Sequence, residues 1–259
     1  ILDRKPLKLT SIAKELGITN QQCIRHLNRL AETGLISKNA EGNYRLTPYG
    51  SMIWRLHPGH EFITKHRDYF ISHTLSKLPD EFLARIGALS NSELKSNVME
   101  AISELEAIIK ESEEYLWVVI DKRTSSVRPF VAGAVERGVS VRSISPRSYV
   151  PSLDVRRDIV EGDELTVIKA EAEGRAEVAD AEDFDLYLYM SEKAVLIAFP
   201  LEDGTFDYTG FTSSDQRAIK YCHDLFEYHW DRSQIVPRSE IVERHIEYLT
   251  KHGIQVKYP

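Results

Sequence analysis

Six polar residues within a single short stretch have side chains suited to binding DNA. Glutamine and asparagine can form paired hydrogen bonds with adenine, and arginine can do so with guanine. Arg25 and Arg29 are four residues apart, which places them on one face of a helix. We expect one of them to contact a base and the other a phosphate. The predicted recognition residues are Asn20, Gln21, Gln22, Arg25, His26 and Arg29.

Apolar residues at helical spacing indicate which face of this helix is buried. Ile24, Leu27 and Leu30 recur at intervals of three residues, so we expect all three to point inward. Cys23 is the alternative for the first of these apolar positions. A second interpretation leaves Gln21 and Gln22 as nothing more than the solvated first turn of the helix.

Two short helices are predicted around this stretch. The first covers residues 11–16 and is capped by Thr10. The second is capped by Thr19 and runs to about Glu32. The N-terminal amides of the first helix suit a phosphate, so Thr10 and Ser11 are also predicted to contact DNA.

A β-hairpin is predicted to follow the two helices. Residues 35–38 and 43–47 have strand character and flank the turn sequence NAEG. Thr47 and Pro48 then start another helix, with threonine as the cap and proline at the first helical position. Polar and basic side chains of such a hairpin can reach phosphates or the minor groove. Those predicted to do so are Lys38, Asn43 and Arg45.

Two helices joined by a short turn and followed by a hairpin form a winged helix-turn-helix. The segments SIAKELGIT, CIRHLNRLAETGLI and GNYRLTPYG resemble the winged-helix module of ArsR-like transcriptional regulators. The resemblance implies that residues 1–57 form a DNA-binding domain, with most of any full helix before Thr10 outside this sequence. Some domains of this type make only protein contacts, and that alternative stays open.

The distribution of charge supports a DNA-binding N-terminal module. Residues 1–57 contain nine Lys or Arg and four Asp or Glu, a balance of +5. Because the chain carries −7 in total, the remaining residues carry −12. A basic module joined to an acidic one favours contact with a polyanion through the basic face alone. Local drift in composition is the alternative explanation.

Beyond the hairpin, helical patterns give way to alternating strands and helices. Residues 49–112 are predicted to be helical, with breaks at Pro58-Gly59 and at Pro79. Strands at 115–120 and 139–145 flank a helix, which is typical of a right-handed parallel crossover. Further strands are expected at 184–190, 194–199 and 206–212, and helices at 127–138, at 214–230 and near the C-terminus. The predicted fold class is α/β, with a winged helix, a helical linker and a C-terminal domain built on a mixed sheet.

This second part of the chain has a resemblance of its own. The segments YFISHTLSKLPDEFLARIGAL, IIKESEEYLWVVID and FTSSDQRAIKYCHDLFEYHWDRS resemble the regulatory domain of archaeal methanogenesis-type regulators. That domain is distantly similar to the one in TrmB-like regulators and to one half of a phospholipase D fold. The resemblance implies a helical linker or dimerisation region at 58–112 and an effector domain at 113–259. Residues 234–259 match neither resemblance.

Two loops at the expected carboxyl ends of strands suit a small anionic effector. Ligands of parallel α/β sheets collect at these ends, and helix N-termini there favour anions. Ordinary solvated loops are the alternative. Tyr187, Tyr189 and Tyr208 are a second candidate lining, which alternation along a strand explains equally well. The predicted ligand-binding residues are Arg123, Thr124, Ser125, Ser126, Arg128 and Arg147.

Motifs for catalysis and metal binding are not found in the sequence. Phospholipase D chemistry needs a His-x-Lys motif, which the chain lacks, and His73, Lys77 and Asp80 have the wrong spacing. The histidines at 57, 60, 66 and 73, and the residues around 222–229, lack the paired spacing of a structural zinc site. We therefore predict no enzymatic activity, no cofactor and no metal.

The sequence also bears on the cellular compartment. The chain has two cysteines far apart and no apolar run of about 18 residues, which favours a reducing cytoplasm and no membrane partner.

These observations predict a DNA-binding transcriptional regulator whose partners are double-stranded DNA, a second copy of the chain and a small anionic effector. A homodimer is expected because one winged helix contacts too few base pairs for useful specificity. Its contact is predicted within residues 48–78, which contain Trp54, Leu56, Phe62, Ile63, Tyr69 and Phe70. A degenerate phospholipase D-type hydrolase and a protein-interaction adaptor are the two alternatives.

Overall fold

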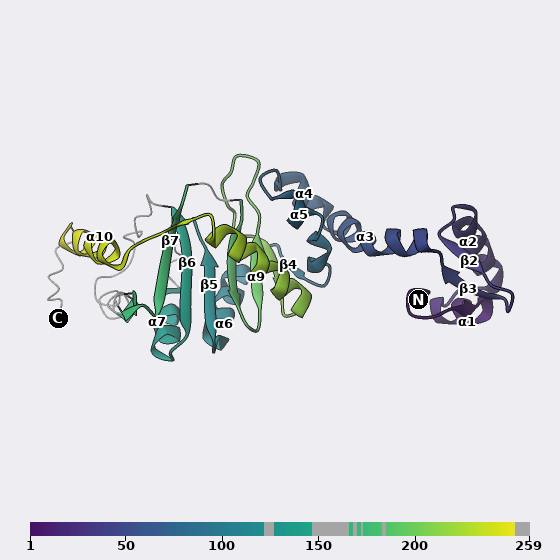
Figure 1. The fold of residues 1–259 in the computed structure, drawn as a ribbon, viewed down its shortest axis with the longest axis horizontal. Helices are drawn as coiled ribbons and strands as arrows, with labels where there is room; N and C mark the ends of the chain where they lie inside the picture. Colours follow the sequence, from purple (N-terminus) through teal and green to yellow (C-terminus); the bar gives the residue numbers. More distant parts are fainter. Residues whose placement is uncertain (122–126, 147–165, 168–169, 172, 183–184, 252–259) are drawn as a thin grey trace. The chain divides into compact units, whose positions relative to one another are not determined.

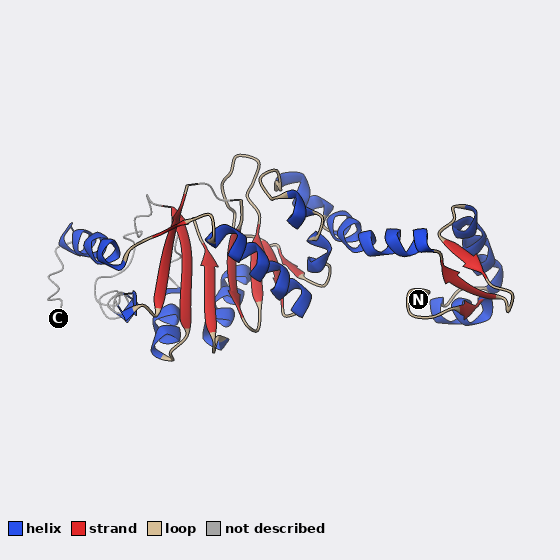
Figure 2. Cartoon of the chain, viewed as in Figure 1, coloured by secondary structure: helices blue, strands red, loops and turns tan. Residues whose placement is uncertain are grey.

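The structure, a computed structural model, describes residues 1–121, 127–146, 166–167, 170–171, 173–182 and 185–251. The chain divides into two compact units, Ile1–Lys65 and His66–Pro259. Helices and strands occur in both units, as Figure 2 shows, and the sheet of the second unit mixes parallel and antiparallel pairs. The α/β class predicted from the sequence is therefore confirmed. Within the described residues, no helix has the length and apolar content needed to cross a bilayer.

The first unit is a winged helix. Its three short strands form an antiparallel sheet in the order β1-β3-β2. The core lies between this sheet and the two predicted helices and consists of Ile12, Ala13, Cys23, Leu27, Ile36 and Tyr44. The elements are β1 (Leu7–Lys8), α1 (Leu9–Leu16), α2 (Asn20–Glu32), β2 (Ile36–Lys38), β3 (Asn43–Leu46) and α3 (Pro48–Lys65).

Two sequence predictions for this unit are wrong in detail. Helix α1 begins at Leu9 with Lys8 as its N-cap, so Thr10 lies inside the first turn and does not cap it. The reason is that β1 leads directly into the helix. Helix α3 continues through Pro58 rather than breaking there. Pro58 leaves the Trp54 carbonyl without its helical donor, but Trp54 is exposed, so water can satisfy that carbonyl.

The second unit is built on one mixed sheet. Among the described residues it has eight strands in the order β11-β7-β6-β5-β8-β9-β10-β4. Strands β5, β6 and β7 run parallel, which confirms the predicted crossover through α7, and the other pairs are antiparallel. The strands are β4 (Glu93–Lys95), β5 (Tyr115–Val119), β6 (Ser140–Pro146), β7 (Ala176–Ala181), β8 (Tyr187–Ser191), β9 (Val195–Ala198), β10 (Gly210–Ser213) and β11 (Gln234–Ile235).

Helices cover both faces of this sheet. Helices α6 and α7 lie on one face and α9 lies on the other (Figure 1). The α6–α7 side holds a large apolar core that includes Leu105, Ile109 and Leu116. The helices are α4 (Arg67–Ser72), α5 (Asp80–Leu83), the 3-10 helix η1 (Ile86–Leu89), α6 (Val98–Glu111), α7 (Arg128–Glu136), α9 (Gln216–Trp230) and α10 (Arg238–Lys251).

The residues from 66 to 112 belong to the second unit and do not form an all-helical linker. Glu93–Lys95 is strand β4, which pairs with β10 in the register Gly210↔Lys95. The three-part division at residues 57 and 112 therefore differs from the structure, which has a single boundary after Lys65. The difference arises because this strand is too short, and too charged, to be recognised from sequence alone.

The C-terminal segment that matched no family pattern completes the sheet edge. Strand β11 pairs antiparallel with β7, and the Val236 amide donates to the Val178 carbonyl at 2.9 Å. Helix α10 follows, and Arg244 binds both carboxylate oxygens of Asp180 at 3.1 and 2.7 Å. The expected strand after this helix lies outside the described residues.

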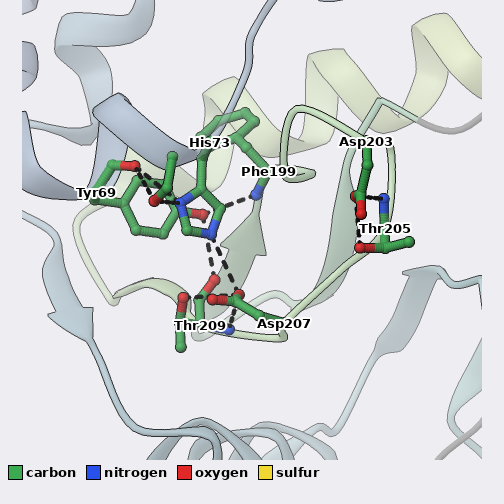
Figure 3. Close-up of polar contacts among 8 residues, drawn as sticks. Tyr69, His73, Phe199, Asp203, Thr205, Asp207 and Thr209 are labelled. Atoms are coloured by element: carbon green, nitrogen blue, oxygen red, sulfur yellow. Dashed lines mark hydrogen bonds and ion pairs between the residues drawn. The ribbon is translucent and has the colours of Figure 1, made fainter.

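A buried histidine ties α4 to the loop between β9 and β10 (Figure 3). The His73 Nδ1 atom lies 2.8 Å from the Tyr69 carbonyl oxygen, and Nε2 lies 3.2 Å from Asp207 Oδ1. The rings of Tyr69 and His73 stack, and the Tyr69 hydroxyl accepts from the Phe199 amide at 3.0 Å. His73 therefore has a packing role in the described structure, with contacts to Tyr69 and Asp207.

The Asp207 carboxylate in this network is held in its charged form. It accepts hydrogen bonds from the Thr209 amide at 2.9 Å and the Thr209 hydroxyl at 2.8 Å. Partial burial raises the pKa of Asp207, but these hydrogen bonds and the one with His73 outweigh it and lower the pKa below its usual value. In the folded state the carboxylate therefore takes up a proton only at lower pH than in the unfolded chain.

We predict that Gly50→Ala destabilises the winged helix by about 1–3 kcal/mol, because the new methyl group has no room. A Cβ atom at Gly50 would overlap the Leu35 carbonyl oxygen and lie 2.8 Å from the Leu35 carbonyl carbon. Thermal unfolding measures the loss. The matched control is Gly133→Ala in α7, where the nearest atom is 3.6 Å away. Equal stability of Gly50→Ala and wild type would contradict this packing.

We predict that Asp207→Asn destabilises the second unit by about 0.5–1 kcal/mol at pH 7, a small effect because the side chain is 38% exposed. The pKa of Asp207 is lower when folded, so its stabilisation is present above the unfolded pKa and is lost as pH falls through the folded pKa. Urea unfolding at pH 7 and at about pH 3 should therefore show the difference between variant and wild type shrinking in acid.

Asp203→Asn is the control for this prediction. Asp203 accepts the same two hydrogen bonds, from the Thr205 amide at 2.9 Å and hydroxyl at 2.7 Å, in an exposed turn without a described histidine contact (Figure 3). Asp203→Asn should lower the free energy of unfolding by less than Asp207→Asn does. Equal losses would mean that the contact with His73 contributes nothing.

Candidate nucleic-acid interface

The start of α2 is fixed by a reciprocal cap. The Gln22 amide donates to the Thr19 hydroxyl at 3.2 Å, and the Gln22 side-chain oxygen accepts from the Thr19 amide at 3.0 Å. This confirms Thr19 as the cap. Paired recognition of adenine needs both the oxygen and the nitrogen of a glutamine side chain. Because the cap occupies the side-chain oxygen of Gln22, only the side-chain NH2 group of this residue is left to bind DNA.

The other end of α2 is also closed by backbone hydrogen bonds. The Gly34 amide donates to the Ala31 carbonyl and the Leu35 amide to the Leu30 carbonyl, both at 2.9 Å. Gly34 has a positive φ of 74°, which glycine adopts at little cost. Both ends of the helix are thus defined, so the orientation of its outer face is set by the core beneath it.

The outer face of α2 forms an open polar groove of about 700 Å³. Four of the predicted recognition residues line it together with three residues that were not predicted to contact DNA. Asn28 and Glu32 follow Gln21 at intervals of seven and eleven residues, a helical spacing that could have identified them. The lining residues are Gln21, Gln22, Ile24, Arg25, Asn28, Arg29 and Glu32.

Ile24 is a correction to the predicted core. Its side chain is 43% exposed, whereas Cys23 is 1% exposed and Leu27 is 4% exposed. One residue along a helix is a rotation of about 100°, so burying Cys23 turns Ile24 outward. Leu30, which was also predicted to point inward, is 40% exposed.

Arg25 and Arg29 differ from five arginines of the second unit in having no described partner. Within the part of the chain that the structure covers, neither guanidinium has a hydrogen bond or ion pair, and both side chains are exposed. Five arginines of the second unit bind carboxylates at 2.6–3.1 Å, namely Arg85, Arg142, Arg175, Arg217 and Arg244. The α2 arginines are therefore available for an external anion.

Not all predicted recognition residues lie on this groove. His26 lines a separate apolar groove of about 540 Å³, together with Leu30, Ile53 and Trp54. Asn20 is exposed at the first position of α2 but is not part of the polar lining. Thr10 and Ser11 are exposed in the first turn of α1.

The hairpin presents two of its three predicted residues to solvent. Lys38 and Arg45 are exposed, and Arg45 has a weak contact to the Ser37 hydroxyl at 3.4 Å. The Lys38 ammonium lies 5.5 Å from the centre of the Tyr44 ring. Asn43 is half-buried and donates to Glu41 at 3.2 Å, so its side chain is engaged in the turn.

The predicted effector residues are largely outside the described structure. Arg123, Thr124, Ser125, Ser126 and Arg147 lie outside the described residues, and only the backbone of Arg128 is described, as the first residue of α7. A pocket of about 380 Å³ at the same end of the sheet is lined, among described residues, by Asp121, Glu182, Asp185 and Glu202 together with Lys77. These acidic side chains do not match the anionic ligand that was expected.

The three tyrosines proposed as an alternative lining are mostly structural. Tyr187 and Tyr189 are 0% and 2% exposed, so both belong to the core. The Tyr208 hydroxyl donates to Asp121 at 3.1 Å, and burial raises the pKa of this phenol. Among the described residues, no three His, Cys, Asp or Glu side chains are placed to hold a metal ion.

Comparison with known proteins gives one curated relative. No family model matches the chain. The chain is 23% identical over 252 residues to the methanogenesis regulatory protein FilR1 of Methanothrix harundinacea (strain 6Ac), covering 93% of this chain and 55% of that protein. The chain thus spans about half the length of the curated relative it matches. This finding confirms the resemblance to methanogenesis-type regulators that the second part of the sequence indicated.

Solved structures give more distant likenesses. TrmBL2, an archaeal chromatin protein with a described DNA-binding mode, has a TM-score of 0.44 and 14% identity, covering 89% of this chain and 88% of that one. Nuc, a phospholipase D family member from Salmonella typhimurium, has a TM-score of 0.39 and 8% identity, covering 56% of this chain and 99% of that one. At such TM-scores the structural likenesses do not identify a function, and the sequence similarity to a regulatory protein is the finding that bears on this chain.

Proposed function

We propose that this chain is a sequence-specific DNA-binding transcriptional regulator that works as a homodimer. The observation that supports DNA binding most directly is the pair of exposed guanidinium groups of Arg25 and Arg29 on the outer face of α2, which have no partner among the described residues. In a winged helix, that face enters the major groove. The similarity to a methanogenesis regulatory protein supports the same function.

The proposal assigns different roles to the two parts of the interface. Gln21, Arg25 and Asn28 lie along one stripe of the groove and contact base edges. Lys38 and Arg45 of the hairpin, and the first turn of α1 with Thr10 and Ser11, contact phosphates. The acidic remainder of the chain disfavours other modes of contact with DNA.

Exposed apolar side chains support the homodimer. Eight of the thirteen large hydrophobic side chains that are exposed among the described residues lie in the first unit. Four apolar residues of α3 recur at intervals of three, four and seven residues, which forms a stripe suited to pairing with a second helix. These residues are Tyr49, Met52, Leu56 and Ile63. We propose that the α3 stripe is the contact between two copies.

This stripe replaces part of the predicted dimer contact. Phe62 and Tyr69 are 1% and 6% exposed, so they are buried within the chain and do not reach a partner. Within the α3 stripe, Leu56 is the most exposed residue at 68%, followed by Met52 at 59%. A ligand response stays a prediction, because the side chains predicted to bind the ligand are not described, namely Arg123, Thr124, Ser125, Ser126, Arg128 and Arg147.

The two alternatives make different predictions. An adaptor that binds protein need not lose affinity steeply with salt, whereas a DNA-binding protein does. A hydrolase would cleave a chromogenic phosphodiester. In this chain His73 is instead engaged with Tyr69 and Asp207. Both assays can be run on the wild-type chain.

We predict that Arg25→Ala weakens binding to a site selected from random DNA by about 1–3 kcal/mol, and that Arg29→Ala reduces the salt dependence of binding by about one phosphate contact. Fluorescence anisotropy at several salt concentrations, on the selected site and on random DNA, measures both effects. Loss of a base contact should reduce the affinity for the selected site more than that for random DNA, whereas loss of a phosphate contact should reduce both affinities equally.

Arg217→Ala is the control for the arginine variants. Arg217 is 58% exposed but pairs with Asp215 in the second unit, so its loss should leave DNA affinity unchanged. If Arg25→Ala and Arg29→Ala also bind like the wild type, the outer face of α2 is not the DNA interface.

We predict that Leu56→Glu converts the dimer to a monomer, because a carboxylate in the α3 stripe would be buried without a partner. Light scattering at micromolar concentration measures the mass. Met99→Glu is the control, since Met99 is 65% exposed in the second unit. A wild-type chain that is monomeric both free and on DNA would defeat the dimer proposal, and a Leu56→Glu chain that stays dimeric would move the contact elsewhere.

A further inference from the structure

Ile24 is an apolar side chain in an otherwise polar groove. Among the described residues that line the groove on α2, Ile24 is the only apolar one. It is 43% exposed although Cys23 and Leu27 already fill the core beneath the helix. The other exposed aliphatic residues of the helix pair, Leu16 and Leu30, line the separate apolar groove. Ile24 therefore belongs to the polar groove alone.

The neighbours of Ile24 define what it can contact. Gln21 lies three residues before it and Asn28 four residues after it, so two amide side chains flank Ile24 on the helix surface. Neither amide has a described partner in the covered part of the chain. Both can therefore form paired hydrogen bonds with adenine. Ile24 lies between these two amides, so in the proposed complex it faces the same base pairs of the DNA major groove as they do.

The major groove offers a methyl group to an apolar side chain at thymine. The edge of each thymine carries a C5 methyl group, and apolar side chains distinguish thymine by contact with it. We propose that Ile24 determines specificity by packing against the C5 methyl group of a thymine in the operator, next to an adenine bound by Gln21 or Asn28. This inference rests on the proposed DNA-binding function of the same groove.

The position of Ile24 along the helix fits such a contact. It lies in the second turn of α2, whose first turn is fixed by the cap between Thr19 and Gln22. The N-terminal part of a recognition helix is the part that reaches base edges. Glu32, at the last position of α2, lines the far end of the groove and disfavours phosphate there. The charge distribution therefore favours base contact at the end where Ile24 lies.

The experiment replaces thymine with deoxyuridine, which lacks only the C5 methyl group. A site is first selected from random DNA with the wild-type chain, and each thymine in it is then replaced singly. The wild type should bind about three- to fivefold more weakly when one particular thymine of the site is replaced, the change expected from losing contact with one methyl group. The Ile24→Ala variant should bind the unmodified site about three- to fivefold more weakly than the wild type does. Replacing the same thymine with deoxyuridine should not weaken the binding of this variant any further.

Leu30→Ala is the matched control, since Leu30 is on the same helix, is 40% exposed and lines the other groove. It should retain the wild-type preference for thymine over deoxyuridine. If Ile24→Ala also retains that preference, or if the wild type is indifferent to every replacement, the role of Ile24 is overturned while DNA binding stands. If the wild type selects no site at all, the proposed function fails and this inference fails with it.

Discussion

The burial of Cys23 and Leu27 decides which face of α2 is left for a partner. These two side chains are four residues apart and pack among Ile12, Ile36 and Tyr44 in the core of the winged helix. Because an α-helix turns by about 100° per residue, burying these two side chains fixes the direction of every other side chain on α2. Arg25 therefore lies opposite the core, and His26 lies beside the apolar groove. A core shifted by one residue would bury Ile24 and rotate the arginines away from the outer face.

The two units use their positive charges in opposite ways. In the second unit, arginines close ion pairs between elements, as Arg85 does with Asp224 and Arg244 with Asp180. Exposed pairs of this kind contribute little stability, but each of them places a carboxylate against a cation of this unit. In the first unit the guanidinium groups of α2 form no described ion pair. Among the described residues, the outer face of α2 therefore carries two guanidinium groups that are not engaged by a carboxylate.

Local sequence signals predicted much of this structure, and non-local packing explains what they missed. The cap at Thr19, the hairpin and the β5–α7–β6 crossover follow from short patterns and were predicted. Ile24 was misplaced because Cys23 and Ile24 fit the apolar spacing equally well, and only the core distinguishes them. Strand β7 was missed because its residues, AEVADA, have little β-branched character and depend on pairing with β6. Asn28 and Glu32 of the groove on α2 were missed because the predicted recognition residues ended at Arg29 and the helical spacing from Gln21 was not followed further.

The C-terminal segment has a consequence for the behaviour of the chain in a crowded cell. Strand β7 is six residues long, and among the described strands only β11 pairs with its outer edge, at Ala179 and Asp180, where the amide and carbonyl groups would otherwise be unpaired. Such an edge is a template on which another chain can add a strand. Strand β11 covers it with two residues only, too few to serve as a template in turn, and the bidentate contact of Arg244 with Asp180 anchors the helix that follows. In the described structure, the residues from Gln234 to Val236 therefore shield this part of the β7 edge, at residues 178–180, from strand addition.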